Sequence, residues 1–172
     1  MRHIFIGFLF VFLDFNLTFG TSQIGLIPDF VGYIFIIQGL AELENLSPRF
    51  IKARPASLGM AMYTGLLYVM ALFGIGSNSI VSFVLGLVST LISLYISYNI
   101  VMGVKDIETS SGRFLNAGGL YSVWTVLAVL SLIIYLLYII PVLNFLCIIA
   151  GLIAGIVFLV SFNKTKNLYY GV

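Results

Sequence analysis

The sequence predicts an all-α integral membrane protein, a single bundle of six transmembrane helices arranged as three hairpins. Of its 172 residues, 61% are hydrophobic and only 8% are charged, and the mean hydropathy is +1.16. Soluble domains carry about 25% charged residues, so this chain has too few to cover a water-facing surface. The apolar residues fall in long runs, as membrane helices require. We therefore treat residues 1–172 as one transmembrane domain.

Six apolar runs predict the spans. A helix rises about 1.5 Å per residue and the hydrocarbon core is about 30 Å thick, so roughly 20 residues cross it. The runs cover about residues 4–19, 24–43, 58–75, 80–101, 120–140 and 142–162. The first run is short and contains Asp14 and Asn16. A cleaved signal peptide over residues 1–20 is the alternative, although Asp14 directly after the apolar core argues against cleavage.

The basic residues predict the orientation. All eight lie before the first run, between runs two and three, between runs four and five, or after run six. They are Arg2, Arg49, Lys52, Arg54, Lys105, Arg113, Lys164 and Lys166. Six spans place all of them on one side, which the positive-inside rule assigns to the cytoplasm. We expect a multi-pass protein of a bacterial plasma membrane with both termini cytoplasmic. Ser47 and Pro48 predict a helix start, with Ser47 as N-cap.

Small and polar residues recur at helical spacing and predict helix-packing faces. In lipid, helices associate where small side chains allow close approach. The residues are Gly25, Gly32 and Gly39 in run two, Ser82, Gly86, Ser89, Ser93 and Ser97 in run four, and Gly151 and Gly155 in run six. For the serine stripe we favour a helix–helix seam over a solute path. The last two glycines could equally contact another copy or a partner subunit, and the sequence does not choose.

Two carboxylates, Asp14 and Asp29, lie inside apolar sequence. Ionisable residues within a membrane are functional-site hypotheses by default. A turn near residues 21–22 would place both at similar depth in a helical hairpin. Such a pair would share a proton, hold a cation or bind a solute amine, or would be satisfied by hydrogen bonds. The candidate substrate- or ion-binding residues are Asp14, Asp29, Asn16 and Gln38.

A simpler interpretation needs no ligand. Pro28 and Asp29 also fit the first turn of the second span, where the helix dipole favours a carboxylate. Residues 20–27 would then form an outer loop, and Asp14 would lie near the outer interface, where charge costs less. The sequence leaves both interpretations open.

Enzyme chemistry is poorly supplied. The only histidine is His3, and the single cysteine, Cys147, lies in an apolar run. We therefore predict no catalytic residues, no metal site and no cofactor. An intramembrane aspartyl hydrolase would need two facing aspartates, which the chain could supply. However, the Tyr-Asp and Gly-x-Gly-Asp motifs of such enzymes are absent.

The stretch from Leu26 to Tyr33, LIPDFVGY, followed by Gly39, resembles a pattern in small uncharacterised multi-pass membrane proteins of low-GC Gram-positive bacteria. That resemblance implies no activity. Six spans with short loops are also similar, in architecture only, to the S-components of energy-coupling vitamin transporters.

These observations lead to two functional hypotheses. The first is a small-solute or ion transport component that uses the carboxylate pair. The alternative is a non-catalytic assembly or regulatory subunit of a larger membrane complex. The expected partners are the lipid bilayer and other membrane subunits or a second copy. A nucleic-acid partner is not expected, because the basic patches are small.

Overall fold

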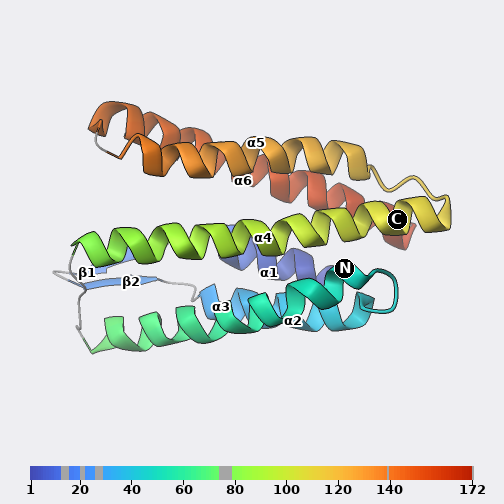
Figure 1. The fold of residues 1–172 in the computed structure, drawn as a ribbon, viewed down its shortest axis with the longest axis horizontal. Helices are drawn as coiled ribbons and strands as arrows, with labels where there is room; N and C mark the ends of the chain where they lie inside the picture. Colours follow the sequence, from blue (N-terminus) through green and yellow to red (C-terminus); the bar gives the residue numbers. More distant parts are fainter. Residues whose placement is uncertain (13–15, 20–21, 26–28, 74–78, 139, 172) are drawn as a thin grey trace.

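The computed structural model describes residues 1–12, 16–19, 22–25, 29–73, 79–138 and 140–171, and the side chains of most of them. These residues form six helices and one short β-ribbon (Figure 1). The elements in chain order are α1 (Arg2–Phe12), β1 (Asn16–Phe19), β2 (Ser22–Gly25), α2 (Asp29–Leu43), α3 (Pro48–Leu72), α4 (Ser79–Ser111), α5 (Ala117–Leu136) and α6 (Pro141–Tyr170). Among the described residues, three helices are long and apolar enough to cross a membrane, namely α4 from Val81, α5 and α6.

The helices pack in sequence order, each against the next, and α6 returns to contact α1 (Figure 1). Three aromatic rings form this last contact. The ring of Phe8 in α1 lies edge-on to Phe158 and Phe162 of α6, with centroid distances of 5.3 and 5.2 Å. All three side chains are buried. The helices therefore form a closed ring around a common interior.

Both termini and the α2–α3 and α4–α5 connections lie at one end of the bundle (Figure 1). Polar contacts organise this end. The Ser47 hydroxyl accepts a hydrogen bond from the Arg49 backbone N–H at 3.2 Å and donates one to Asp106 at 2.6 Å. Arg49 also pairs with Asp106 at 3.2 Å, so α3 and α4 are joined there. The helix start predicted at Ser47 and Pro48 is confirmed.

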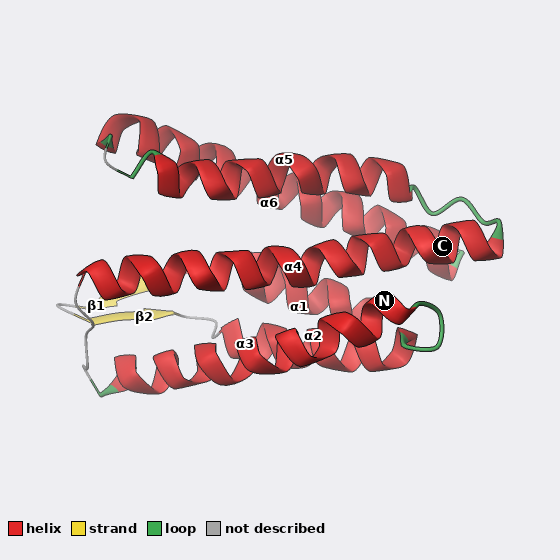
Figure 2. Cartoon of the chain, viewed as in Figure 1, coloured by secondary structure: helices red, strands yellow, loops and turns green. Residues whose placement is uncertain are grey.

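The first two runs differ from the predicted helical hairpin. Helix α1 ends at Phe12, and β1 pairs antiparallel with β2, with Asn16 opposite Gly25 and Phe19 opposite Ser22 (Figure 2). Helix α2 begins only at Asp29. A proline at position 28 explains the late start, because the residue before a proline is disfavoured in helical conformation. Two short helices and a ribbon therefore replace the predicted helices over 4–19 and 24–43.

Helices α4 and α6 extend beyond their predicted spans of 80–101 and 142–162. At about 1.5 Å per residue both are well over 40 Å long, more than a hydrocarbon core of about 30 Å requires. The extra turns carry polar residues, including Lys105 and Lys164. The α4–α5 connection begins only at Gly112, whose φ of 65° is readily adopted by glycine.

Glycines set the closest helix contacts. A Cβ added to Gly7 would lie 2.6 Å from the carbonyl oxygen of Gly32, and one added to Gly39 would lie 2.8 Å from the backbone nitrogen of Ile4. Because a side chain at either site would meet backbone, the close approach of α1 and α2 requires glycine at both positions. Gly32 lies at the same contact, where an added Cβ would meet the Gly7 carbonyl oxygen at 2.9 Å. Gly25 lies in β2 and so does not share their helix face.

Candidate functional site

A cavity of about 210 Å³ lies between the helices, and five of them contribute to its wall. Its polar lining comes from α2, α3, α4 and α5: Asp29, Tyr33, Thr64, Ser89, Thr90, Ser93, Ser97 and Ser131. Val11 and Phe12 close it on the α1 side. The cavity thus combines one carboxylate with a set of hydroxyl groups inside an otherwise apolar bundle.

Four of these seven hydroxyls donate their proton to a backbone carbonyl of their own helix, among them Ser89, which donates to Gly86 at 3.4 Å. Thr64 donates to the carbonyl of Met60 at 2.8 Å, Ser97 to that of Leu94 at 3.1 Å, and Ser131 to that of Leu127 at 2.8 Å. Each is a bond to the preceding turn of the same helix, a common use of serine and threonine in helices. A hydroxyl has one proton and two lone pairs, so these groups keep only acceptor capacity for a guest.

Further hydroxyls on the cavity wall bind one another across helices. The Tyr33 hydroxyl lies 2.5 Å from Ser93 Oγ, which joins α2 to α4. Thr90 Oγ1 lies 2.9 Å from the Tyr135 hydroxyl of α5. In each pair one proton lies between two oxygens, so each pair retains one proton and several lone pairs. These bonds hold the wall of the cavity in place.

Asp29 is the first residue of α2 and lies in its first turn. The positive end of the helix dipole there favours the ionised carboxylate. Its side chain is partly buried, and Oδ1 has essentially no solvent-accessible surface. Fourteen residues separate Asp29 from Leu43 at the other end of α2, so it lies roughly 20 Å from the basic end of the bundle. The described residues that line the cavity include no Lys or Arg.

The other predicted binding residues have different outcomes. Gln38 is exposed on α2 and does not line the cavity. Asn16 lies in β1, but its side chain is outside the described part of the structure. Asp14 lies outside the described residues altogether. The structure therefore places Asp29 in a cavity and leaves its pairing with Asp14 a prediction.

The serine stripe of α4 faces the cavity along much of its length. Ser89, Ser93 and Ser97 line the wall. Ser93 and Ser97 also lie at helix–helix seams, as the spacing predicts, because Ser93 bonds to Tyr33 of α2 and Ser97 accepts from Trp124 of α5. Gly86 does form a seam, because a Cβ there would lie 3.2 Å from the Tyr135 hydroxyl of α5. Ser82, at the far end of the stripe, is exposed.

The glycine pair of α6 packs within the chain. A Cβ on Gly151 would lie 3.3 Å from Ile134 of α5, and one on Gly155 would lie 3.9 Å from Phe12 of α1. The sequence left open whether these glycines contact another chain. In the structure Gly155 is buried, whereas Gly151 is only partly covered.

Sequence reasoning missed Tyr33, Thr64 and Thr90 as lining residues. Tyr33 follows Asp29 by one helical turn, and this spacing could have identified it. Thr64 and Thr90 are isolated polar residues on α3 and α4, and no local pattern distinguishes them from lipid-facing threonines. Only the helix packing brings them beside Asp29.

Within the part of the chain that the structure describes, no three His, Cys, Asp or Glu side chains come together to hold a metal ion. Cys147 is partly buried in α6 and does not line the cavity. Among the described residues, the polar groups that line the cavity are one carboxylate and seven hydroxyls.

Comparison of the chain with protein-family models, curated proteins and solved structures finds no match in any of the three.

Proposed function

We propose that the chain is a six-span protein of a bacterial plasma membrane with both termini in the cytoplasm. Three apolar helices of sufficient length support the membrane location. The basic residues, the termini and two of the connections gather at one end of the bundle, which supports the orientation (Figure 1). In this arrangement α1, the ribbon and α2 together take the place of the first two spans.

Within this frame, the protein is a transport component for a small cation, and the cavity beside Asp29 is its binding site. One observation carries the proposal. The lining offers a carboxylate and seven hydroxyls, and four of these hydroxyls donate their protons to helix carbonyls. Such a surface presents oxygen lone pairs, which bind a metal cation or an ammonium group and repel an anion.

The location of Asp29 adds a physical reason. Asp29 already has contacts within the protein, and a bound cation would add to the stabilisation of its carboxylate. The first turn of α2 would help to stabilise the carboxylate between binding events. This arrangement meets the needs of a site that is occupied and emptied in turn.

The alternative, an assembly or regulatory subunit, has less support. Its strongest sequence signal was the set of glycine faces open to another chain. Gly7, Gly32 and Gly39 pack between α1 and α2, and Gly151 and Gly155 pack against α5 and α1.

The test is cation-dependent stabilisation of the purified protein. Thermal unfolding is measured in dodecyl maltoside with choline chloride as background and Na⁺, K⁺ or methylammonium added in turn. A ligand present at ten times its dissociation constant stabilises the folded state by about 1.4 kcal/mol. We expect at least one of these cations to raise the unfolding midpoint of the wild type but not of Asp29→Asn.

Glu44→Gln is the matched control, because Glu44 is a carboxylate at the opposite end of the bundle, paired with Arg54 at 2.9 Å. It should retain the full cation response. The proposal fails if no cation stabilises the wild type, or if Asp29→Asn responds as the wild type does.

A further inference from the structure

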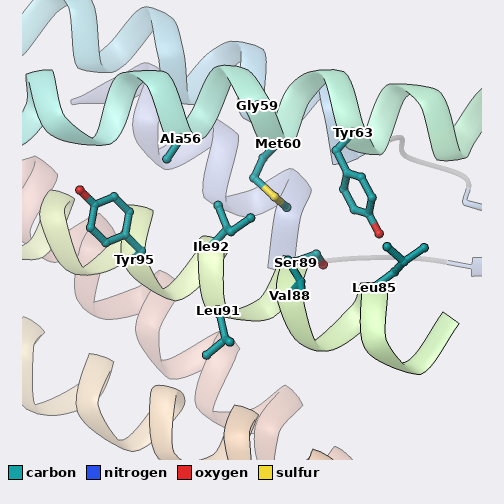
Figure 3. A pocket seen from close by; sticks show the side chains of 10 residues that line it. All are labelled: Ala56, Gly59, Met60, Tyr63, Leu85, Val88, Ser89, Leu91, Ile92 and Tyr95. Carbon is teal, nitrogen blue, oxygen red and sulfur yellow. The ribbon is translucent and has the colours of Figure 1, made fainter. Parts of the chain in front are cut away.

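An apolar groove of about 510 Å³ runs between α3 and α4 beside the cavity (Figure 3). Gly59, Leu85, Val88 and Leu91 contribute to its wall. Val88 and Leu91 are about half exposed on α4, so the groove opens on the outer surface of the helix ring. In the membrane arrangement proposed above, this surface faces the hydrocarbon core.

The groove meets the polar cavity. Met60 and Ser89 line both spaces, so their side chains stand where one ends and the other begins. Figure 3 shows Met60 projecting from α3 toward α4. Methionine is unbranched and has three rotatable side-chain bonds, so Met60 can move aside at low cost. A continuous path would then lead from lipid to the carboxylate of Asp29.

From this juxtaposition we infer that the ligand is a single-chain amphiphilic amine that enters from the membrane between α3 and α4. Its ammonium group binds at Asp29, and its hydrocarbon chain lies in the groove. This inference rests on the proposed cation site and names its substrate class. The charge complementarity is specific, because the acceptor oxygens lie at the inner end of an otherwise apolar path.

The dimensions agree with one chain. Sites for drug-sized ligands enclose about 300–1,000 Å³, and the groove falls in the middle of that range. The carboxylate and hydroxyls of the cavity can accept all three hydrogen-bond donors of a primary ammonium group. A quaternary ammonium group has no such donors and would leave these acceptors unused.

Gly59 allows a selective test of the groove. A Cβ added at Gly59 meets no atom within 4 Å, so Gly59→Phe places a ring in open space instead of against backbone. Gly118 in the first turn of α5 is equally unobstructed and lies outside the groove, which makes Gly118→Phe the matched control.

The experiment compares methylammonium with octylammonium in dodecyl maltoside, with apparent dissociation constants taken from the concentration dependence of the unfolding midpoint. We expect the wild type and Gly118→Phe to bind octylammonium at least tenfold more tightly than methylammonium. Gly59→Phe should weaken octylammonium binding at least tenfold and change methylammonium binding less than twofold. Because the micelles are the same for all variants, partitioning cancels when the binding of one amine is compared between variants. For the comparison of the two amines, the free octylammonium concentration is corrected for its measured partitioning into micelles.

Equal binding of the two amines by the wild type would overturn the inference, as would an undiminished octyl preference in Gly59→Phe. Displacement of octylammonium by phosphatidylethanolamine added to the micelles would also overturn it, since the occupant would then be a lipid headgroup. In each of these three cases, the proposed cation site remains supported if methylammonium binds to the wild type but not to Asp29→Asn. If methylammonium binds no more tightly to the wild type than to Asp29→Asn, this inference falls. The cation site itself falls only if Na⁺ and K⁺ also stabilise the wild type no more than Asp29→Asn.

Discussion

Replacing Gly7 by alanine tests the packing that closes α1 onto α2. The new Cβ would lie 2.6 Å from the Gly32 carbonyl oxygen and 2.9 Å from the Ile36 backbone nitrogen. Both are backbone atoms, so the helices must separate. Inserting atoms into a packed core costs about 1–3 kcal/mol, and backbone contact places this site near the upper end.

A gain in helix propensity partly offsets that cost, because alanine is favoured over glycine by about 1 kcal/mol within a helix. We therefore expect Gly7→Ala to lower the free energy of unfolding by about 2 kcal/mol. For a chain of this length, 1 kcal/mol corresponds to about 2–4 °C, so the unfolding midpoint should fall by about 4–8 °C. Thermal unfolding of the detergent-solubilised protein measures this directly.

Gly59→Ala is the control, because its added Cβ meets no atom within 4 Å. It keeps the propensity gain without the clash, so its midpoint should equal or exceed that of the wild type. If Gly7→Ala and Gly59→Ala unfold at the same temperature, the close approach of α1 and α2 is refuted.

Two further predictions concern the cavity wall and the orientation. The indole N–H of Trp124, the sole tryptophan, donates to Ser97 Oγ at 2.9 Å. Ser97→Ala should therefore lower the free energy of unfolding by about 1–3 kcal/mol and shift the tryptophan fluorescence emission. Ser122→Ala, on the exposed side of α5, is the control and should change neither. In a Cys147→Ser background, Val142→Cys in intact cells should react with a membrane-impermeant thiol reagent, and Ser110→Cys should react only after permeabilisation. The reverse pattern, or equal labelling of both, would rule out cytoplasmic termini.

The first two runs show where sequence reasoning failed. Hydropathy averages over neighbouring residues, so residues 4–19 read as one apolar run although a helix occupies only Arg2–Phe12 within the described residues. The β-ribbon depends on pairing between Asn16–Phe19 and Ser22–Gly25. A hydropathy average over a window of residues does not detect such pairing. The proline at position 28 was a usable local signal, because it favours a first helical turn that contains Pro28 and Asp29, and α2 begins at Asp29 within the described residues.

The sequence by itself determined the apolar character of the chain, the gathering of its basic residues and the glycines at which helices approach, because each depends on residue type and spacing along one segment. The tertiary structure alone decided what surrounds Asp29. The cavity joins Asp29 to Ser131, 102 positions further along the chain, through helices whose rotation is set by close packing at glycines and aromatic rings. The same spacing of serines along α4 is compatible with a face toward lipid, toward a neighbouring helix or toward a cavity. The direction in which these serine side chains point depends on which helices pack against α4, and that packing depends on all six helices together.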